Sequence, residues 1–165
     1  NAVAQAAEVA GPHPDILVVP GTAYPKAIRG DPQVIEWSAQ GHKTPKWTTS
    51  VCTGALGLAV AGVLKRLKAT THWLAHEVLK EFGATPTKAR VVRDGKVFTA
   101  AGVSSGIDMA LTLVAEEFGA EAAQLTQLLI EYDPQPPFNS GSPDKAPSAI
   151  VHEAREAFAK LQVAQ

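Results

Sequence analysis

The chain has 165 residues, of which 45% are hydrophobic and 19% are charged, and its formal net charge is −1. This apolar content is enough for a hydrophobic core, and we expect residues 1–165 to form a single domain. The near-neutral charge gives no electrostatic basis for a nucleic-acid partner, and no apolar run approaches the length of a membrane span. We therefore expect neither nucleic acid nor membrane as a partner.

The first elements in the chain indicate a buried strand followed by a helix. Residues 1–11 are Ala-rich and lack the basic region of a signal peptide. Residues 15–19 are a continuous apolar run closed by Pro20-Gly21, which is typical of a buried parallel strand that ends in a turn. Asp31-Pro32 predicts the N-cap and first position of a helix that ends near Gln40-Gly41.

The centre of the chain is a turn that carries its only cysteine, Cys52. Residues 47–51 predict a strand, and an apolar, buried helix follows from Gly54 to Leu64. Ser50 and Gly54 give the small-x-nucleophile-x-small spacing of a nucleophile elbow, with Cys in place of Ser. The helix N-terminus favours a thiolate, so we expect Cys52 to be a nucleophile; the alternative is a buried structural cysteine. A lone thiol also excludes an internal disulfide and fits a reducing compartment, so we expect a cytoplasmic protein.

Shorter elements follow the elbow. Residues 69–71 predict a brief strand with His72-Trp73 at its end, and a helix from about Leu74 to Phe82 stops at Gly83. Two strands flank Asp94-Gly95, a strong hairpin-turn signal.

The last third of the chain is predicted to be helical. After the small-residue crossing 100–103, a helix begins with Ser105 and Asp108 at capping-box spacing. Its expected apolar face comprises Ile107, Ala110, Leu111, Val114, Ala115 and Phe118. A second helix runs from Ala120 to about Ile130, a Pro-rich arm covers residues 131–147, and residues 148–163 predict a final amphipathic helix.

The alternation of strands and helices predicts an α/β fold with a parallel sheet, whose functional groups gather at the carboxyl ends of the strands. Pro20-Gly21-Thr22, Cys52-Thr53 and His72 each follow a predicted strand. Their shared position indicates one site. An alternative for His72-Trp73 is that it caps and packs a strand end, and we favour that alternative because a neutral histidine is commonly a satisfied polar group.

Several motifs together resemble the DJ-1/PfpI superfamily of class I glutamine-amidotransferase-like proteins and, within it, the isonitrile (isocyanide) hydratases. They are Asp15-Ile-Leu-Val-Val-Pro-Gly21, Asp31-Pro-Gln33, Thr49-Ser-Val-Cys-Thr-Gly54, Ala69-Thr-Thr-His-Trp73, Arg90-Val-Val-Arg-Asp-Gly95, Gly102-Val103 with Gly106-Ile-Asp108, and Glu131-Tyr-Asp-Pro-Gln-Pro-Pro-Phe138 with Gly141-Ser-Pro143. The resemblance implies a flavodoxin-like, doubly wound, mostly parallel sheet with helices on both faces.

The resemblance also implies roles for individual residues. Cys52 matches the family's nucleophile, and Thr53 follows it with a backbone N–H and a hydroxyl that serve the site. Gly21-Thr22 falls on the loop that supplies the other oxyanion-type N–H, although Thr22 stands where a second glycine is usual. The segment from Ala101 through Gly102 to Val103 lies where the family packs its backbone against the cysteine.

The family begins with a strand and helix that carry an acidic residue beside the cysteine, and the resemblance implies that this segment belongs before Asn1. We therefore expect a fragment, a nicked product or half of a two-chain protein, with a companion chain that supplies the acid. Without that companion, the strand before Cys52 is expected to lose a neighbour. The family commonly forms homodimers, and the Pro-rich arm is the candidate contact.

The resemblance implies a cofactor-independent hydration of a small-molecule isocyanide to an N-substituted formamide, through attack by the Cys52 thiolate. Alternatives are a glyoxalase-like enzyme acting on another small electrophile and a non-catalytic ligand-sensing domain. A Cys-His dyad has less support because Thr53 stands where the superfamily's proteases place histidine. His72 and His76 are spaced for one helix face, but the set lacks a third ligand, so we expect no metal. The glycines form no phosphate loop, so we expect no nucleotide cofactor.

Overall fold

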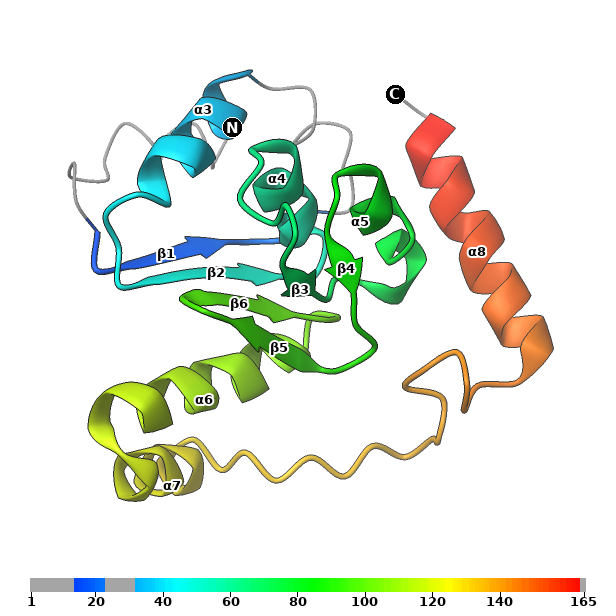
Figure 1. The fold of residues 1–165 in the computed structure, drawn as a ribbon. Coiled ribbons are helices and arrows are strands. Elements are labelled where there is room, and N and C mark those ends of the chain that lie inside the picture. Colours follow the sequence, from blue (N-terminus) through cyan, green and yellow to red (C-terminus); the bar gives the residue numbers. More distant parts are fainter. Residues whose placement is uncertain (1–13, 23–31, 164–165) are drawn as a thin grey trace. The chain divides into compact units, whose positions relative to one another are not determined.

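The computed structural model describes residues 14–22 and 32–163. Its strands are β1 (Ile16–Val19), β2 (Trp47–Val51), β3 (Lys68–Ala69), β4 (Thr85–Pro86), β5 (Val91–Asp94) and β6 (Val97–Ala100). Its helices are α3 (Pro32–Gly41), α4 (Gly54–Val60), the 3-10 helix η1 (Trp73–Ala75), α5 (Val78–Glu81), α6 (Ser105–Phe118), α7 (Ala120–Leu129) and α8 (Ser148–Val163) (Figure 1). Residues 1–106 and 107–165 form two compact units, which we describe separately. The predicted N-cap Asp31 and the stretch 1–11 lie outside the described residues.

The first unit contains a four-stranded sheet in the order β1-β2-β6-β5. β1, β2 and β6 are parallel, and β5 joins β6 as an antiparallel edge strand. The predicted α/β class with a mostly parallel sheet is confirmed. The expectation that the strand before Cys52 lacks a neighbour is wrong, because β2 pairs with β1 on one side and β6 on the other. Among the described strands, the edge next to β2 is β1.

The core of this unit lies between the sheet and the helices α3 and α4, which cover one face of β1 and β2 in Figure 1. In β1, Leu17 and Val19 are buried, whereas Ile16 and Val18 are 41% and 50% exposed. This alternation follows from the two-residue period of a strand. The buried residues of α4 are Gly54, Ala55, Leu56, Gly57, Leu58 and Ala59, as its apolar sequence predicts.

Between α4 and β5 the structure is more broken than the sequence predicts. α4 ends at Val60 rather than Leu64, and Gly62 has a φ of 77° that a continuing helix does not permit. The helix predicted over 74–82 is two short pieces, η1 and α5. The predicted strand 69–71 is two residues long and begins at Lys68, where it pairs with the unpredicted β4. Local pattern overestimates element length here because each piece is stabilised by tertiary packing rather than by propensity.

The predicted β5–β6 hairpin is present with its turn shifted by one residue. Asp94 pairs with Val97, so Gly95 and Lys96 form the two-residue loop, and Gly95 has a φ of 59°. The Lys96 ammonium group donates to the carbonyl oxygens of His42 and Pro45. The hairpin is thereby tied to the segment that precedes β2.

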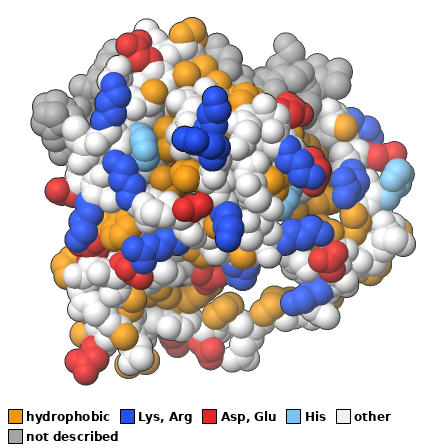
Figure 2. Space-filling model, in the orientation of Figure 1, with side chains coloured by type: hydrophobic (Ala, Val, Ile, Leu, Met, Phe, Trp, Pro, Cys, Tyr) orange, Lys and Arg blue, Asp and Glu red, His pale blue; other side chains and the backbone are white. Residues whose placement is uncertain are grey.

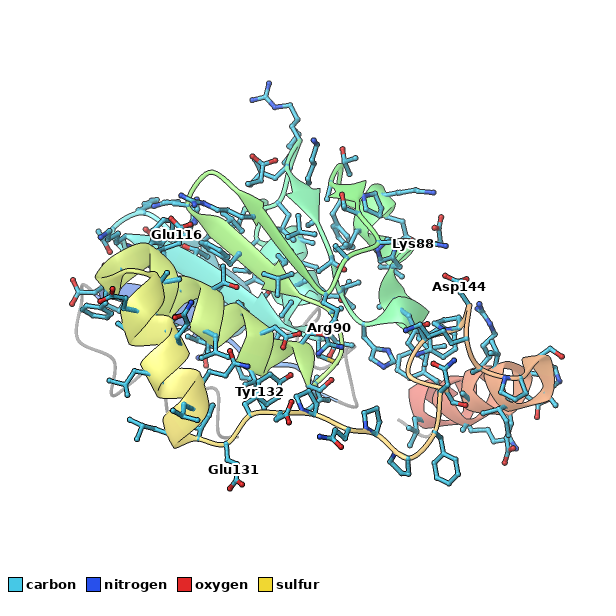
Figure 3. The ribbon with its side chains drawn as sticks, turned by 90° about the horizontal axis from the view of Figure 1, so that it is seen from below. Lys88, Arg90, Glu116, Glu131, Tyr132 and Asp144 are labelled. Atoms are coloured by element: carbon cyan, nitrogen blue, oxygen red, sulfur yellow. The ribbon has the colours of Figure 1, made fainter. Side chains whose placement is uncertain are left out.

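The second unit contains α7, the arm and α8, together with α6 from Ile107 onward. The hydroxyl of Tyr132 donates to Asp108 Oδ1 at 2.7 Å, and Figure 3 shows Tyr132 directed towards α6 while Glu131 points away. Ser105, predicted to start this helix in a capping box with Asp108, is its first residue, and the Asp108 carboxylate accepts from Tyr132. The residues of α6 with the lowest exposure are Ser105, Met109 and Leu113, whereas Ile107 and Phe118 are exposed, so the predicted apolar face is wrong. Nearly every turn of α6 carries apolar residues on several sides, and periodicity alone does not select the buried one.

Within residues 14–22 and 32–163, none of the helices combines the length and hydropathy that a membrane crossing requires.

Candidate active site at the Cys52 elbow

Cys52 lies between β2 and α4 and adopts a left-handed backbone conformation, with a φ of 57°. This conformation is uncommon for a residue with a side chain and is typical of a sharp functional turn. The Cys52 N–H donates to the carbonyl oxygen of Ala100 at 3.0 Å, which ties the turn to the end of β6. The thiol is free and partly exposed. The elbow conformation predicted from the small-residue spacing is therefore present.

Two glycines allow the backbone to pass close to this turn. A Cβ added at Gly21 would lie 2.8 Å from the Cys52 Cβ and 3.1 Å from the Thr53 nitrogen. A Cβ added at Gly54 would lie 2.2 Å from the carbonyl oxygen of Val19 and 2.7 Å from that of Pro20. The end of β1 and the elbow therefore approach so closely that only glycine fits at either position.

The Thr53 side chain fastens the Gly21-Thr22 loop to the elbow. Thr53 is 2% exposed. Its hydroxyl accepts from the Thr22 N–H at 2.9 Å and donates to the Thr22 carbonyl oxygen at 2.7 Å. The Thr22 N–H, expected from the resemblance to serve an oxyanion, thus binds the Thr53 hydroxyl here. The two threonines hold each other, and this orients the backbone on both sides of the thiol.

The segment after β3 reaches the elbow through a residue that sequence reasoning missed. The Thr71 hydroxyl donates to the Cys52 carbonyl oxygen at 2.8 Å, and Thr71 is 1% exposed. The preceding Thr70 donates its backbone N–H to Thr99 Oγ1 at 2.9 Å. The only sequence signal for Thr71 was its position at a predicted strand end beside His72.

His72 lies at the same end of the sheet and caps the helix η1. Its Nδ1 accepts from the Leu74 N–H at 3.4 Å, and burial lowers the pKa of its imidazole below the ordinary value. A Cβ added at Gly102 would lie 3.8 Å from His72 Cδ2. His72 and Gly102 are therefore neighbours, and the capping contact agrees with the favoured alternative that His72 is a satisfied polar group.

The crossing after β6 brings the start of α6 to the elbow strand. Ala101 donates its N–H to the Arg90 carbonyl oxygen, and a Cβ added at Gly106 would lie 3.2 Å from Val51 Cγ1. The side chain of Val103 is 80% exposed. Of the predicted pair Gly102-Val103, the backbone at Gly102 is thus the part that lies near the other site residues.

No group of three or more His, Cys, Asp and Glu side chains within residues 14–22 and 32–163 is arranged to hold a metal ion. His76 Nε2, from the predicted His72/His76 pair, is buried and has no hydrogen-bond partner among the described residues. On the face shown in Figure 2, Lys and Arg side chains are interspersed with Asp and Glu. The described part of the site is therefore built from a thiol, hydroxyls, an imidazole and backbone groups.

Comparisons with known proteins agree with this geometry. The model of the DJ-1/PfpI family matches residues 2–116. The isonitrile hydratase of Pseudomonas putida is 50% identical over 142 residues, which are 86% of this chain and 62% of the hydratase. A Parkinson disease protein 7 homologue of Danio rerio is 30% identical over 125 residues, covering 74% of this chain and 66% of that protein.

Solved structures are similar over most of the chain. A ThiJ/PfpI family protein from Pseudomonas syringae superposes with a TM-score of 0.89 and 40% identity, covering 94% of this chain and 65% of that one. Drosophila melanogaster DJ-1beta has a TM-score of 0.62 at 22% identity, covering 80% of this chain and 70% of that one, which supports the fold alone. The chain thus spans about two thirds of the length of these relatives.

Proposed function

Because the chain belongs to the DJ-1/PfpI family, we propose that it catalyses the hydration of an isocyanide to an N-substituted formamide, with Cys52 as the nucleophile. The observation that carries this proposal is the elbow: a partly exposed thiol on a left-handed residue between a central parallel strand and a helix. The identity of 50% to an isonitrile hydratase supports isocyanides as the substrate class.

In the proposed reaction, the Cys52 thiolate forms a bond to the terminal carbon of R–N≡C. That carbon takes up a proton, which gives the thioimidate R–N=CH–S–Cys52. Water then adds to the same carbon while nitrogen is protonated, and the C–S bond breaks to release R–NH–CHO and the thiolate. Two protons are taken up and two are returned, so the cycle consumes one water and requires no external oxidant, reductant or cofactor.

The neighbours of Cys52 have supporting roles in this proposal. The Thr53 N–H stabilises developing negative charge or positions water, and Thr53 Oγ1 holds the loop at Gly21 and Thr22. Gly102 leaves room beside His72, whose depressed pKa keeps the imidazole neutral near pH 7.

We propose that the general-acid carboxyl comes from a companion segment outside this chain. Within the described residues, the polar contacts of Cys52 are to backbone groups and to the Thr71 hydroxyl, with no carboxylate among them. The companion would pair with β1 and complete the sheet. Partial coverage of the hydratase, 62% of its length, supports this proposal. Intact mass spectrometry of the preparation would detect such a segment.

We also propose a cytoplasmic homodimer that uses the arm 131–147. Support for the location comes from the single free thiol. Support for the dimer comes from the apolar residues that the second unit leaves exposed, among them Leu128 at 77% and Phe138 at 78%. Light scattering should give twice the mass of one chain together with its companion segment, and Phe138→Asp should lower the measured mass towards half of that value.

The activity is tested by measuring formamide release from cyclohexyl isocyanide. We expect turnover by the protein and none by Cys52→Ala, while the control Ser104→Ala, at an exposed position, keeps the wild-type rate. Methylglyoxal is assayed in parallel. A complete protein that consumes methylglyoxal and leaves the isocyanide unchanged would refute hydration, and activity in Cys52→Ala would refute the nucleophile.

A further inference from the structure

We propose that Thr71 is a positioning residue, which holds the Cys52–Thr53 peptide in the orientation that catalysis requires. This inference rests on the proposed function because it takes Cys52 as the nucleophile and the Thr53 N–H as the oxyanion donor. It assigns a role in the site to a residue whose hydroxyl binds the Cys52 backbone.

The contact is short, buried and directed at the residue with the unusual backbone. Thr71 Oγ1 donates to the Cys52 carbonyl oxygen at 2.8 Å, and the other donor to this oxygen, the Ala55 N–H, is at 3.5 Å. Thr71 is 1% exposed, so water does not readily replace its hydroxyl. The Thr71 hydroxyl is therefore the stronger of the two contacts to the carbonyl.

The planar peptide unit couples the orientation of the Cys52 carbonyl to that of the Thr53 N–H, the predicted oxyanion donor. A trans peptide is planar, and its C=O and N–H point in opposite directions. The Cys52 carbonyl and the Thr53 N–H belong to the same peptide, so fixing the carbonyl towards Thr71 directs the N–H to the other side. The Thr53 nitrogen lies 3.1 Å from the position that a Gly21 Cβ would occupy. Thr71 thus directs the Thr53 N–H away from the segment after β3, and the Thr53 nitrogen lies beside the Gly21-Thr22 loop.

The left-handed conformation of Cys52 is strained, and the hydrogen bond from Thr71 opposes its relaxation. A non-glycine residue at a φ of 57° relaxes towards negative φ unless its surroundings hold it, and that relaxation rotates both the carbonyl and the side chain. The Cys52 N–H is held by Ala100, and Thr71 holds the carbonyl. Thr71 is itself anchored, because the backbone of Thr70 binds Thr99 Oγ1. The N–H of the strained residue is therefore fixed to the end of β6 and its carbonyl to the segment after β3, which is itself tied to β6 through Thr99.

The test compares Thr71→Val and Thr71→Ala, which delete the hydroxyl, with Thr71→Ser, which keeps it. Thr70→Val is the matched control, because Thr70 is the adjacent threonine, is also 1% exposed, and keeps its backbone bond to Thr99 when its side chain changes. Two rates are measured on the full chain: iodoacetamide alkylation across pH 6–9, and turnover of cyclohexyl isocyanide. Since the chain has one cysteine, alkylation reports on Cys52 alone.

We expect both hydroxyl deletions to lower the alkylation rate and kcat by about three- to tenfold, the size of one lost hydrogen bond, with KM changed by less than about twofold. Thr71→Ser should recover at least about half of each rate, and Thr70→Val should match the wild type. Thermal unfolding confirms that each variant is folded at the assay temperature, and Thr71→Ala serves if Thr71→Val does not fold.

Wild-type rates in the folded deletion variants would overturn the inference, and so would a Thr70→Val defect as large as theirs or a lack of rescue by serine. The alkylation rate separates this inference from the proposed function. If the wild type does not hydrate isocyanide but Thr71→Val still slows alkylation, the substrate assignment fails and the role of Thr71 stands. If the wild type hydrates the isocyanide and Thr71→Val matches it in both assays, the proposed function stands and the role of Thr71 fails.

Discussion

Replacement of Gly54 by alanine should destabilise the protein at the elbow. The added Cβ would lie 2.2 Å from the Val19 carbonyl oxygen and 2.7 Å from that of Pro20. Both atoms belong to the backbone at the end of β1, so no side chain can rotate to relieve the overlap. The strand end and the elbow must therefore move apart.

The magnitude follows from two opposing terms. Overpacking a close contact costs about 1–3 kcal/mol, and an overlap with two backbone carbonyls belongs at the upper end. Alanine at the start of a helix gains at most about 1 kcal/mol over glycine. The net loss is then about 2 kcal/mol, which corresponds to a fall of about 4–8 °C in Tm for a chain of this size.

The assay is thermal unfolding followed by circular dichroism, with alkylation of Cys52 as a local readout. Gly41→Ala is the matched control, since its Cβ would meet the Leu17 side chain alone, with Cδ2 at 3.4 Å and Cδ1 at 3.8 Å, and these are ordinary contacts with a flexible side chain. Gly141→Ala, with nothing within 4 Å, is a second control. If Gly54→Ala has the same Tm as these controls and its thiol reacts at the wild-type rate, the reasoning from the close approach of β1 to the elbow is refuted.

Two further predictions concern interactions away from the thiol. Burial and the nearby Lys96 hold the pKa of His42 below its ordinary value of 6.5, so the unfolded chain binds this proton more readily than the folded one. The contribution of His42 to stability should be intact above pH 6.5 and decline as the pH falls below it. The urea midpoint should therefore fall less steeply between pH 8 and pH 5 in His42→Gln than in the wild type. Equal slopes in the two proteins would contradict this reasoning. Tyr132→Phe removes the hydrogen bond to Asp108 and should lower the free energy of unfolding, measured by urea denaturation, by about 0.5–1.5 kcal/mol. The rate of Cys52 alkylation should stay unchanged. An unchanged free energy of unfolding would contradict the contact.

Much of the fold could be predicted from the sequence because its main strands carry strong local signals. The apolar runs before Pro20-Gly21 and before Cys52 are β1 and β2, and the turn glycine at 95 identifies the β5–β6 hairpin. The short pieces between α4 and β5 could not be predicted, because fewer than five residues in each leave no period to read. Helix α6 was located, but its buried side was not, since apolar residues surround it.

Part of the candidate site could also be predicted from the sequence, and part could not. Cys52 and its flanking small residues, Ser50 and Gly54, are visible in sequence because a sharp turn requires small residues at fixed spacing. The contact of Thr71 with the Cys52 carbonyl joins residues 19 positions apart, and that of Thr53 with Thr22 joins residues 31 positions apart. A threonine near a strand end is common, and only the register of the strands decides which hydroxyl meets which carbonyl.

The site is held mainly by backbone groups, and this determines which substitutions it can tolerate. Hydroxyls of Thr53 and Thr71 bind main-chain atoms of Thr22 and Cys52, so serine can replace either threonine where the packing allows. Gly21 has no such substitute, because any Cβ there would lie only 2.8 Å from the Cβ of Cys52. Substitution at this elbow is therefore restricted more strictly at the glycines than at the threonines. Changes in substrate specificity should come from other segments around the thiol, and not from the residues that fix the elbow backbone.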